Sequence, residues 1–358
     1  MGTPSRKKLR EIIARLENLK EKLDTGEAII LLKAVNLFYL TGKDLGTAII
    51  TQDENVLWLK DLYIEHYSDF YLDENYPFSV RNYDKEDIKR FIEKSKIRIL
   101  WIENLNLTTI DNLKKMLPGN IKITQSSIVE NMRIKKSKYE ISILKKSCKL
   151  AKKAMNKCKE LLCSRNSGLR EIELAAEIEA FLRKNGSEEP PFGIGSIISA
   201  NKNSADIHAK PGNRKIPKRG SILVDIGAKI QGYYSDMTRT FLLGNIKKKS
   251  LRDMIDSVKN LELEVIDMIY PGILAKEVHE FVQREIEKIS GRQFYHSTGH
   301  GVGLEIHERP NLGPDSNDIL DEGMVFTVEP GVYIPRKFGI RFEDTVLLTR
   351  NKCRILTK

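Results

Sequence analysis

The chain has 358 residues, of which 41% are hydrophobic and 30% charged, and its formal net charge is +11. This composition suits about two globular domains and excludes a disordered chain, a collagen-like repeat and a coiled coil. No apolar run approaches the ~18 residues that span a bilayer, and no secretory signal follows the basic N-terminus. The four cysteines show no CxxC spacing, which is typical of a reducing compartment. We therefore expect a cytoplasmic protein that binds no membrane.

The first 125 residues alternate between helical and extended patterns. Apolar spacing and turn residues predict helices over residues 5–23, 85–94 and 111–117, and strands over residues 28–32, 47–50, 56–59, 97–102 and 121–124. Such alternation indicates a small α/β domain. We place its end near residue 130, in a charged connection.

The excess positive charge is concentrated in one stretch. Residues 126–165 hold 12 Lys or Arg and 3 Asp or Glu, whereas the segments before and after it each carry a net charge of +1. Apolar residues recur there at steps of three and four, which predicts an amphipathic helix over 139–163 with lysines on its other faces. A solvated helix face and an anion-binding or partner surface are both open interpretations. Without zinc-finger spacing or interleaved aromatic residues, we expect no nucleic-acid binding.

The remaining chain, residues 131–358, combines helices with many strands. Helices are predicted over residues 139–163, 169–185, 251–270 and 275–289, and strands over residues 222–228, 233–243, 301–306, 324–330 and 340–348. A tight turn at Gln231 and Gly232 joins the first two strands. Helices that flank a mostly antiparallel sheet define an α+β domain.

One histidine stands out among the six of the chain. His300 lies in the sequence Thr-Gly-His-Gly-Val-Gly, between His296 and His307. Glycines on both sides remove side-chain bulk, so the backbone can pack closely and present the imidazole to a cleft. We interpret His296 as a supporting or structural residue.

Four carboxylates lie in segments that otherwise have the pattern of buried strands: Asp225, Asp236, Glu329 and Glu343. A buried ionised carboxylate costs several kcal/mol unless it is paired or holds a metal ion. Only Arg239 and Arg341 are available as partners in these strands. Four carboxylates and one imidazole match the ligands of two divalent first-row ions, such as Mn, Fe, Co or Zn, and the absence of thiolates argues against a structural zinc site.

The motifs around these residues are similar to those of the pita-bread metallopeptidases (family M24). The sequence resembles the Xaa-Pro aminopeptidase and prolidase branch through the strings VDIGA, YYSDMTRTF, STGHGVGLEIHE, VEPGVYIP and RFEDTVL. Near the N-terminus, NLFYLTG resembles the creatinase-type N-terminal domain. The resemblance implies an α+β protein with a creatinase-like α/β domain over residues 1–130 and a pita-bread catalytic domain over residues 131–358.

The resemblance also implies a role for each motif residue. Asp225 would bind one metal ion, Asp236 and Glu343 would bridge two ions, and His300 and Glu329 would complete the second ion's ligands. Glu329 would also accept a proton from the attacking water. His208 and His307 would lie near the scissile bond without binding metal, where they would stabilise the tetrahedral intermediate or assist proton transfer to the proline nitrogen.

The function implied is an Xaa-Pro aminopeptidase that acts through a hydroxide bridging two divalent ions, with Mn expected and Co or Zn as alternatives. The alternative is a prolidase, which cleaves Xaa-Pro dipeptides, and the remote alternative is a non-catalytic binding module on the same fold. Many prolidases carry an arginine that can hold the dipeptide carboxylate where this chain has Asn311, with Arg309 two residues earlier. This difference favours longer substrates. The expected partners are a proline-containing peptide and a second copy of the chain in a homodimer.

Overall fold

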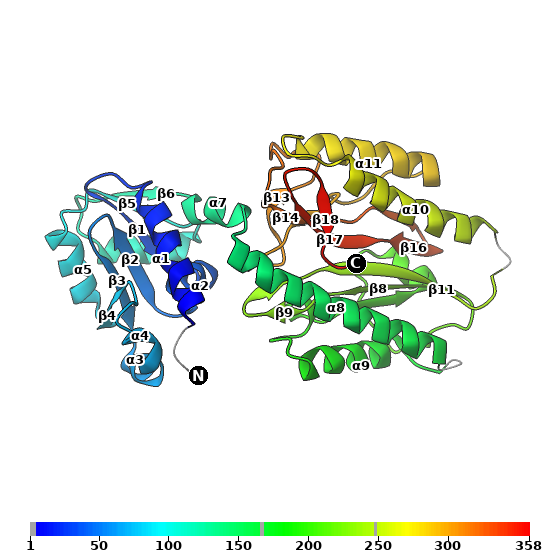
Figure 1. Cartoon of the computed structure of the whole chain (residues 1–358), viewed down its shortest axis with the longest axis horizontal. Helices are drawn as coiled ribbons and strands as arrows, with labels where there is room; N and C mark the ends of the chain where they lie inside the picture. The colour runs from blue at the N-terminus through cyan, green and yellow to red at the C-terminus, as the bar shows by residue number, and fades with distance from the viewer. Residues whose placement is uncertain (1–4, 165–167, 247–248) are drawn as a thin grey trace. The chain divides into compact units, whose positions relative to one another are not determined.

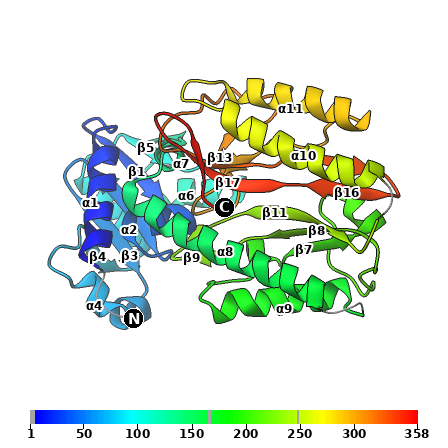
Figure 2. The same cartoon turned by 45° about the vertical axis from the view of Figure 1, so that its right-hand side comes forward.

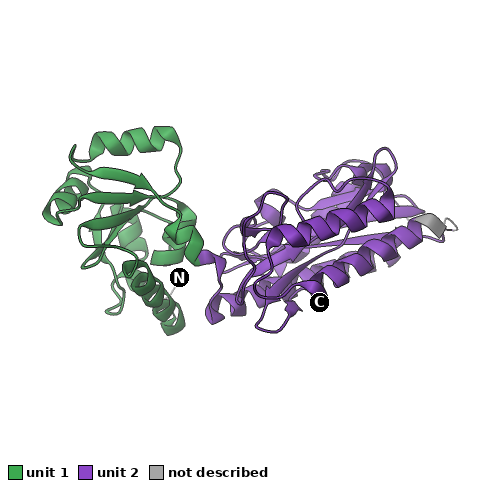
Figure 3. Ribbon diagram, turned by 90° about the horizontal axis from the view of Figure 1, so that it is seen from above, with its two compact units in different colours: residues 1–132 green, residues 133–358 purple. Residues whose placement is uncertain are grey.

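The computed structural model of the chain describes residues 5–164, 168–246 and 249–358. The chain divides into two compact units, residues 1–132 and 133–358, which are coloured separately in Figure 3. Within the described residues, each helix is too short or too polar to cross a membrane.

The first unit is built on a mixed six-stranded sheet. Its strands are β1 (Glu27–Leu31), β2 (Thr47–Thr51), β3 (Asn55–Leu59), β4 (Ser79–Asn82), β5 (Ile99–Ile102) and β6 (Lys122–Gln125). The order is β4-β3-β2-β1-β5-β6, in which β1, β2 and β3 run antiparallel and β5, β6 and β4 each lie parallel to a neighbour. The central strands are buried on both faces, which explains their continuous apolar sequences.

Helices α1 (Arg6–Lys20), α2 (Ala34–Thr41), α3 (Asp61–His66), α4 (Ser68–Tyr71), α5 (Lys85–Lys94) and α6 (Leu107–Met116) complete this unit, and α7 (Ile128–Ile134) follows β6. Helix α1 begins at Ser5, whose hydroxyl accepts a hydrogen bond from the Lys8 amide. Its apolar residues are buried at steps of three and four. The predicted α/β character of this region is therefore confirmed, although α2, α3, α4 and β4 lack a pattern strong enough to have been predicted.

The second unit contains an antiparallel sheet with the order β13-β12-β14-β17-β11-β8-β7, and β18 pairs with β17. Its strands are β7 (Ile197–Ala200), β8 (Gly220–Ile226), β11 (Met237–Leu243), β12 (His300–Gly301), β13 (Glu308–Asn311), β14 (Val325–Val328), β17 (Glu343–Leu348) and β18 (Cys353–Ile355). Two short hairpins accompany it: β9 (Lys229–Ile230) with β10 (Tyr233–Tyr234), and β15 (Gly331–Ile334) with β16 (Phe338–Arg341).

Two pairs of helices cover this sheet, and Figures 1 and 2 show the strands between them. Helices α8 (Lys138–Ser164) and α9 (Glu171–Lys184) pack on β7, β8 and β11 around one hydrophobic core. Helices α10 (Lys249–Met268) and α11 (Ala275–Ser290) pack on β14, β16 and β17 around another. Two short 3₁₀ helices, Pro191–Gly193 and Asn201–Ala205, flank β7. The α+β prediction for this part of the chain is confirmed.

Helix α8 is the predicted basic helix. Its described buried residues include Leu144, Cys148, Ala151, Met155 and Cys158, so most of the predicted apolar stripe faces the core. The lysines at positions 145, 146, 149, 152, 153 and 159 are exposed. A solvated face and a partner surface both stay consistent with this arrangement.

Three strand predictions differ from the structure. The strand predicted over 301–306 is wrong, because only His300–Gly301 is extended and residues 302–307 bend back so that β13 can pair with β12. The strand predicted over 340–348 divides at Phe342 between β16 and β17, which lie in different sheets. The strand predicted over 233–243 is interrupted at Ser235 and Asp236. The turn at Gln231 and Gly232 is confirmed, and both residues have positive φ angles.

Candidate metal centre

Strand register places three polar residues in one row across the sheet of the second unit. Thr238 on β11 lies opposite Asp225 on β8 and opposite Glu343 on β17. Side chains at such directly paired positions are close neighbours. The Thr238 hydroxyl donates a hydrogen bond of 2.5 Å to Glu343 Oε2, so these two side chains of the row are in direct contact.

Asp236 lies in the break between β10 and β11, and its main chain is fixed by a single neighbour. The Asp236 amide donates to Thr345 Oγ1 at 3.2 Å, and that hydroxyl donates to the Asp236 carbonyl at 2.7 Å. The strand predicted over 233–243 is interrupted here, which the sequence pattern did not indicate. The hydrogen bonds to Thr345 therefore hold Asp236 against β17, beside Glu343.

The backbone around His300 packs as closely as its glycine neighbours suggested. A Cβ atom on Gly299 would lie 1.9 Å from the Thr327 carbonyl oxygen, and one on Gly301 would lie 2.2 Å from the Arg309 carbonyl oxygen. A side chain at either position would collide with backbone. The two glycines are thus required for β12 to approach β13 and β14.

His300 faces the carboxylates with its Nε2 atom. This atom lies 3.7 Å from Asp236 Oδ2 and 3.5 Å from Glu329 Oε1, while Nδ1 is 3.2 Å from the Gly301 carbonyl oxygen. Burial and the neighbouring His307 lower the pKa of His300 to about 3. The imidazole is therefore neutral near pH 7, and neutral imidazole is the form that binds metal ions.

Glu329 follows β14 directly. Its amide donates to the Thr298 carbonyl at 2.8 Å, and its carboxylate lies 3.7 Å from His296 Nδ1. Burial, together with the negative charge of Asp225, raises the pKa of Glu329 to about 7 despite the opposing charge of Arg341. A carboxyl group with this pKa can accept and release a proton near neutral pH.

The four carboxylates and His300, which we name the carboxylate–histidine cluster, are buried, apart from the partly buried Glu329, with too little positive charge among the described residues. Burial raises the pKa of Asp236 well above its usual value, and the charges of Glu343 and Asp225 raise it further. Burial and the charges of Glu329 and Asp225 likewise raise the pKa of Glu343. Oδ1 of Asp225 and Oδ1 of Asp236 are both buried without a hydrogen-bond partner among the described residues.

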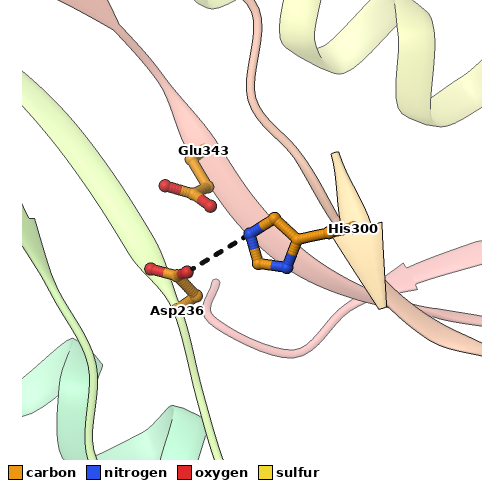
Figure 4. A group of neighbouring side chains, drawn as sticks. All are labelled: Asp236, His300 and Glu343. Carbon is orange, nitrogen blue, oxygen red and sulfur yellow. Dashed lines mark ion pairs between the residues drawn. The ribbon is translucent and has the colours of Figure 1, made fainter. Parts of the chain in front are cut away.

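These unpartnered oxygens fit a metal site. Asp236, His300 and Glu343 each offer a ligand atom, and these atoms all lie within 4.8 Å of one another, as Figure 4 shows. Glu329 is near the same His300 nitrogen. Asp225 lies outside this group of three, in the cross-strand row. Oxygen and imidazole donors suit divalent first-row ions.

A hydrogen-bonded chain supports Asp225 from the side of β16. Arg341, which is 3% exposed, donates to Asp225 Oδ2 at 2.6 Å, to Tyr333 OH at 2.9 Å and to Thr238 Oγ1 at 3.1 Å. Tyr333 OH lies 2.9 Å from His296 Nε2. His296 therefore has the supporting position expected for it. Tyr333 was missed by the sequence reasoning, although its place in VEPGVYIP was a signal.

The two arginines of these strands do not both pair with carboxylates of the cluster. Arg341 pairs with Asp225, whereas Arg239 pairs with Asp344 at 2.6 Å and donates to the Glu343 carbonyl. Among the described residues, Asp225 is thus the one carboxylate of the cluster that pairs with an arginine.

The two outer histidines lie at the rim of the cluster. The His307 ring is exposed and contacts the His300 ring edge to face, with 4.2 Å between ring centroids. His208 is also exposed, and its amide donates to Asp206 Oδ1 at 3.1 Å. Burial lowers the pKa of His307, and among its charged neighbours Asp225 raises this pKa and His208 lowers it. His208 therefore lies within electrostatic range of His307.

The fold and the carboxylate–histidine cluster together are those of a metallopeptidase. The sequence model described as "Metallopeptidase family M24" matches residues 142–350, a stretch that contains the whole cluster. The chain therefore belongs to metallopeptidase family M24, and its fold is the pita-bread fold with a smaller α/β domain before it.

Relatives of known structure or name cover nearly the whole chain. An Xaa-Pro dipeptidase from Pyrococcus furiosus is 33% identical over 354 residues, which are 96% of this chain and 97% of the relative. An Xaa-Pro dipeptidase structure from Bacillus anthracis has a TM-score of 0.87 at 28% identity and covers 98% of both chains. An X-Pro aminopeptidase structure from Thermotoga maritima has a TM-score of 0.84 at 26% identity and covers 96% of this chain and 97% of its own.

Proposed function

We propose that this protein is a metal-dependent Xaa-Pro dipeptidase, a prolidase. The observation that carries the proposal is the carboxylate–histidine cluster, in a chain whose similar relatives from P. furiosus and B. anthracis are named Xaa-Pro dipeptidases. These names favour the dipeptidase alternative over the aminopeptidase that the motifs alone suggested. The proposed substrate is a dipeptide with proline in the second position.

In this proposal Asp225, Asp236, His300, Glu329 and Glu343 hold two divalent ions, with Mn(II) as the expected metal. Bound divalent ions supply Lewis-acid polarisation of the scissile carbonyl and lower the pKa of water at the site. The Asp, Glu and His side chains of the cluster do not supply Lewis-acid polarisation by themselves.

The protein's own groups then move protons and stabilise charge. In this proposal Glu329 accepts the proton of the attacking water. His307 and His208, at the rim, stabilise charge that develops on the carbonyl oxygen or deliver a proton to the proline nitrogen. The contact of the His307 ring with the His300 ring supports this role for His307.

An Xaa-Pro aminopeptidase is the second candidate, and one ion pair favours it. Arg309 is the nearest arginine in sequence to the position that holds a dipeptide carboxylate in many prolidases, and its guanidinium pairs with Asp318. Asp318 Oδ2 also accepts from the Asn311 amide at 2.8 Å. An arginine that already binds an aspartate is a weaker anchor for a substrate carboxylate, and such an anchor matters less for longer peptides.

The test compares Xaa-Pro dipeptides with Xaa-Pro-Xaa tripeptides as substrates of the Mn(II)-loaded protein. We expect higher kcat/KM with the dipeptide, and loss of turnover after chelation that returns when Mn(II) is added. A tripeptide preference would instead support the aminopeptidase. Hydrolysis of neither peptide by fully loaded protein would contradict both. Sedimentation of the same preparation tests the predicted homodimer. The cytoplasmic location stays a prediction.

A further inference from the structure

Two cations at the start of the second unit are buried rather than solvated. The Lys136 side chain is 1% exposed and the Arg133 side chain 3% exposed. Arg133 lies near the C-terminal end of α7, and Lys136 lies just before α8. Long basic side chains are almost never fully buried unless they are paired, so their partners indicate what they do.

The Lys136 ammonium group makes three short polar contacts. Its Nζ atom donates to the carbonyl oxygens of Arg133 at 2.7 Å and Ile134 at 3.1 Å, and pairs with Glu308 Oε1 at 2.7 Å. The ammonium group thus makes two hydrogen bonds to backbone oxygens and one ion pair. Two of the contacts shape the local chain, while the third reaches a residue more than 170 positions away in the sequence.

Arg133 binds the other oxygen of the same carboxylate. Its guanidinium nitrogen NH2 lies 2.6 Å from Glu308 Oε2 and 2.7 Å from Glu305 Oε2. Glu308 is therefore held through both oxygens by two buried cations. Burial alone would raise the pKa of Glu308, but the charges of Lys136 and Arg133 outweigh it and lower this pKa below its usual value.

The held carboxylate lies against the glycine-rich motif. A Cβ atom on Gly303 would be 2.3 Å from Glu308 Oε1, so the carboxylate occupies the space that a side chain would need. Gly303 donates its amide to the Glu305 carbonyl, and its own carbonyl accepts from the Tyr234 amide at 2.8 Å. The loop of residues 302–307 thus closes around Glu308 and touches the strand that leads to Asp236.

Glu308 is the residue that follows His307. Residues 302–307 form bends rather than a strand, so the position of His307 depends on how the two ends of this loop are fixed. Gly301 fixes the first end in β12, where it pairs with Phe326 on β14. Glu308, held by Arg133 and Lys136, fixes the second end at the start of β13.

We infer that Arg133 and Lys136 are positioning residues of the reaction: they hold Glu308 and thereby keep the His307 ring against His300, beside the reacting peptide bond. The inference rests on the proposed function, because it assumes that His307 assists the hydrolysis. A displacement of about 1 Å at a catalytic group can lower the rate up to ~100-fold, so such an anchor affects kcat without touching substrate.

The first experiment replaces Lys136 by methionine in the full-length, Mn(II)-loaded protein. We expect kcat to fall about 10-fold with bound metal unchanged, as is usual when a supporting contact of an active-site group is lost. Lys135→Met is the matched control, because Lys135 is the next residue and its pair with Asp321 is exposed. Exposed pairs contribute little, so this control keeps wild-type kcat.

A double-mutant cycle separates positioning from a general structural effect. We expect His307→Ala to lower kcat about 100-fold, and Lys136→Met to have no further effect in that background. A 10-fold loss in both backgrounds, or no loss in the wild-type background, would overturn the inference. Because Lys136→Met removes one of the two cations that pair with Glu308 and leaves Arg133 as its partner, the pair Lys136→Met with Glu308→Gln provides a second variant in which the carboxylate charge is removed together with the lysine charge.

Crystal structures supply a readout that needs no turnover. In the Lys136→Met protein, or in the double variant, we expect the His307 ring to move by about 1 Å or more from its contact with His300. An unmoved ring would overturn the inference even if activity fell. If the wild-type protein cleaved neither peptide, the proposed function would fail, and the crystallographic comparison would still decide whether the two cations position His307.

Discussion

The two units of the molecule bury carboxylates in different ways. In the first unit, Glu103 is 1% exposed and accepts hydrogen bonds from the amides of Leu32 and Lys33 at 2.6 and 2.7 Å and from Asn36 Nδ2 at 2.6 Å. These groups lie at the start of helix α2, where a negative charge is favoured by the helix dipole. Each Glu103 oxygen has a partner, so the carboxylate acts as a structural cap.

In the second unit, the carboxylate–histidine cluster keeps acceptor oxygens unused. Oδ1 of Asp225 and Oδ1 of Asp236 have no hydrogen-bond partner among the described residues, and burial and the charges of Glu343 and Asp225 raise the pKa of Asp236. Burial alone therefore does not distinguish a structural carboxylate from a ligand. Unused acceptor oxygens on two carboxylates that repel each other do, and this comparison can be tested by removing charge from each unit in turn.

The largest effect is expected for Asp236→Asn. Loss of this proposed metal ligand should remove several kcal/mol of charge stabilisation, which corresponds to a fall in kcat of about 1000-fold. The metal-free variant should be at least as stable as metal-free wild type, because the substitution relieves repulsion with Glu343 and Asp225. Metal analysis measures the bound metal, peptide hydrolysis measures kcat, and denaturant unfolding measures the stability of the metal-free proteins.

Asp256→Asn is the matched control, since Asp256 is an exposed aspartate on α10. It should leave metal content, kcat and stability unchanged. A metal-free Asp236→Asn protein that is clearly less stable than wild type would show that Asp236 is a structural carboxylate, like Glu103, and would break the distinction.

The second-largest effect is expected in the pH dependence of the stability of the metal-free protein. Burial and the Asp225 charge raise the pKa of Glu329 from 4.5 to about 7, so the folded state holds this proton more tightly than the unfolded chain. Its contribution to stability is complete below about pH 4.5 and is lost as the pH rises through about 7, a change of about 3 kcal/mol. Denaturant unfolding of wild type and Glu329→Gln across this range isolates the contribution. Parallel pH curves for the two proteins would contradict it.

The smallest effect is expected for Glu103→Gln in the first unit. This substitution keeps the shape of the side chain but replaces one acceptor oxygen by an NH₂ group, which then faces a hydrogen-bond donor at the start of α2. The free energy of unfolding of this unit should fall by about 2 kcal/mol, because that buried donor loses its partner. Amide exchange at α2 reports the local loss. Bound metal per chain should stay at its wild-type value. A loss of metal would mean that the two kinds of buried carboxylate are not independent.

The sequence was most informative where chemistry needs particular residue types at fixed places. The glycines around His300 indicated a close backbone approach, and Gly299 and Gly301 do lie against carbonyl oxygens of neighbouring strands. The family and the fold could be recognised from the same motifs. The assignment of metal-binding and catalytic roles to single residues stays a prediction, because it depends on a metal ion and a substrate.

Other features depend on contacts between distant segments, which local patterns do not carry. Helix α2 is apolar on most faces and is capped by Glu103, about 70 residues away, so periodicity gives no signal for it. Lys136 has the sequence context of an exposed lysine beside a basic helix, and its pair with the distant Glu308 contributes to its burial. The breaks at Asp236 and Phe342 likewise follow from sheet geometry rather than from alternation.

The cross-strand row of Asp225, Thr238 and Glu343 has a consequence for how this protein can vary. Side chains alternate between the two faces of a strand, so a one-residue insertion or deletion within β11 would put Met237 or Arg239 in the place of Thr238. The same slip would turn the chain leading to Asp236 to the wrong face. Length changes within β8, β11 and β17 should therefore disrupt the site, whereas substitutions there leave the strand register unchanged.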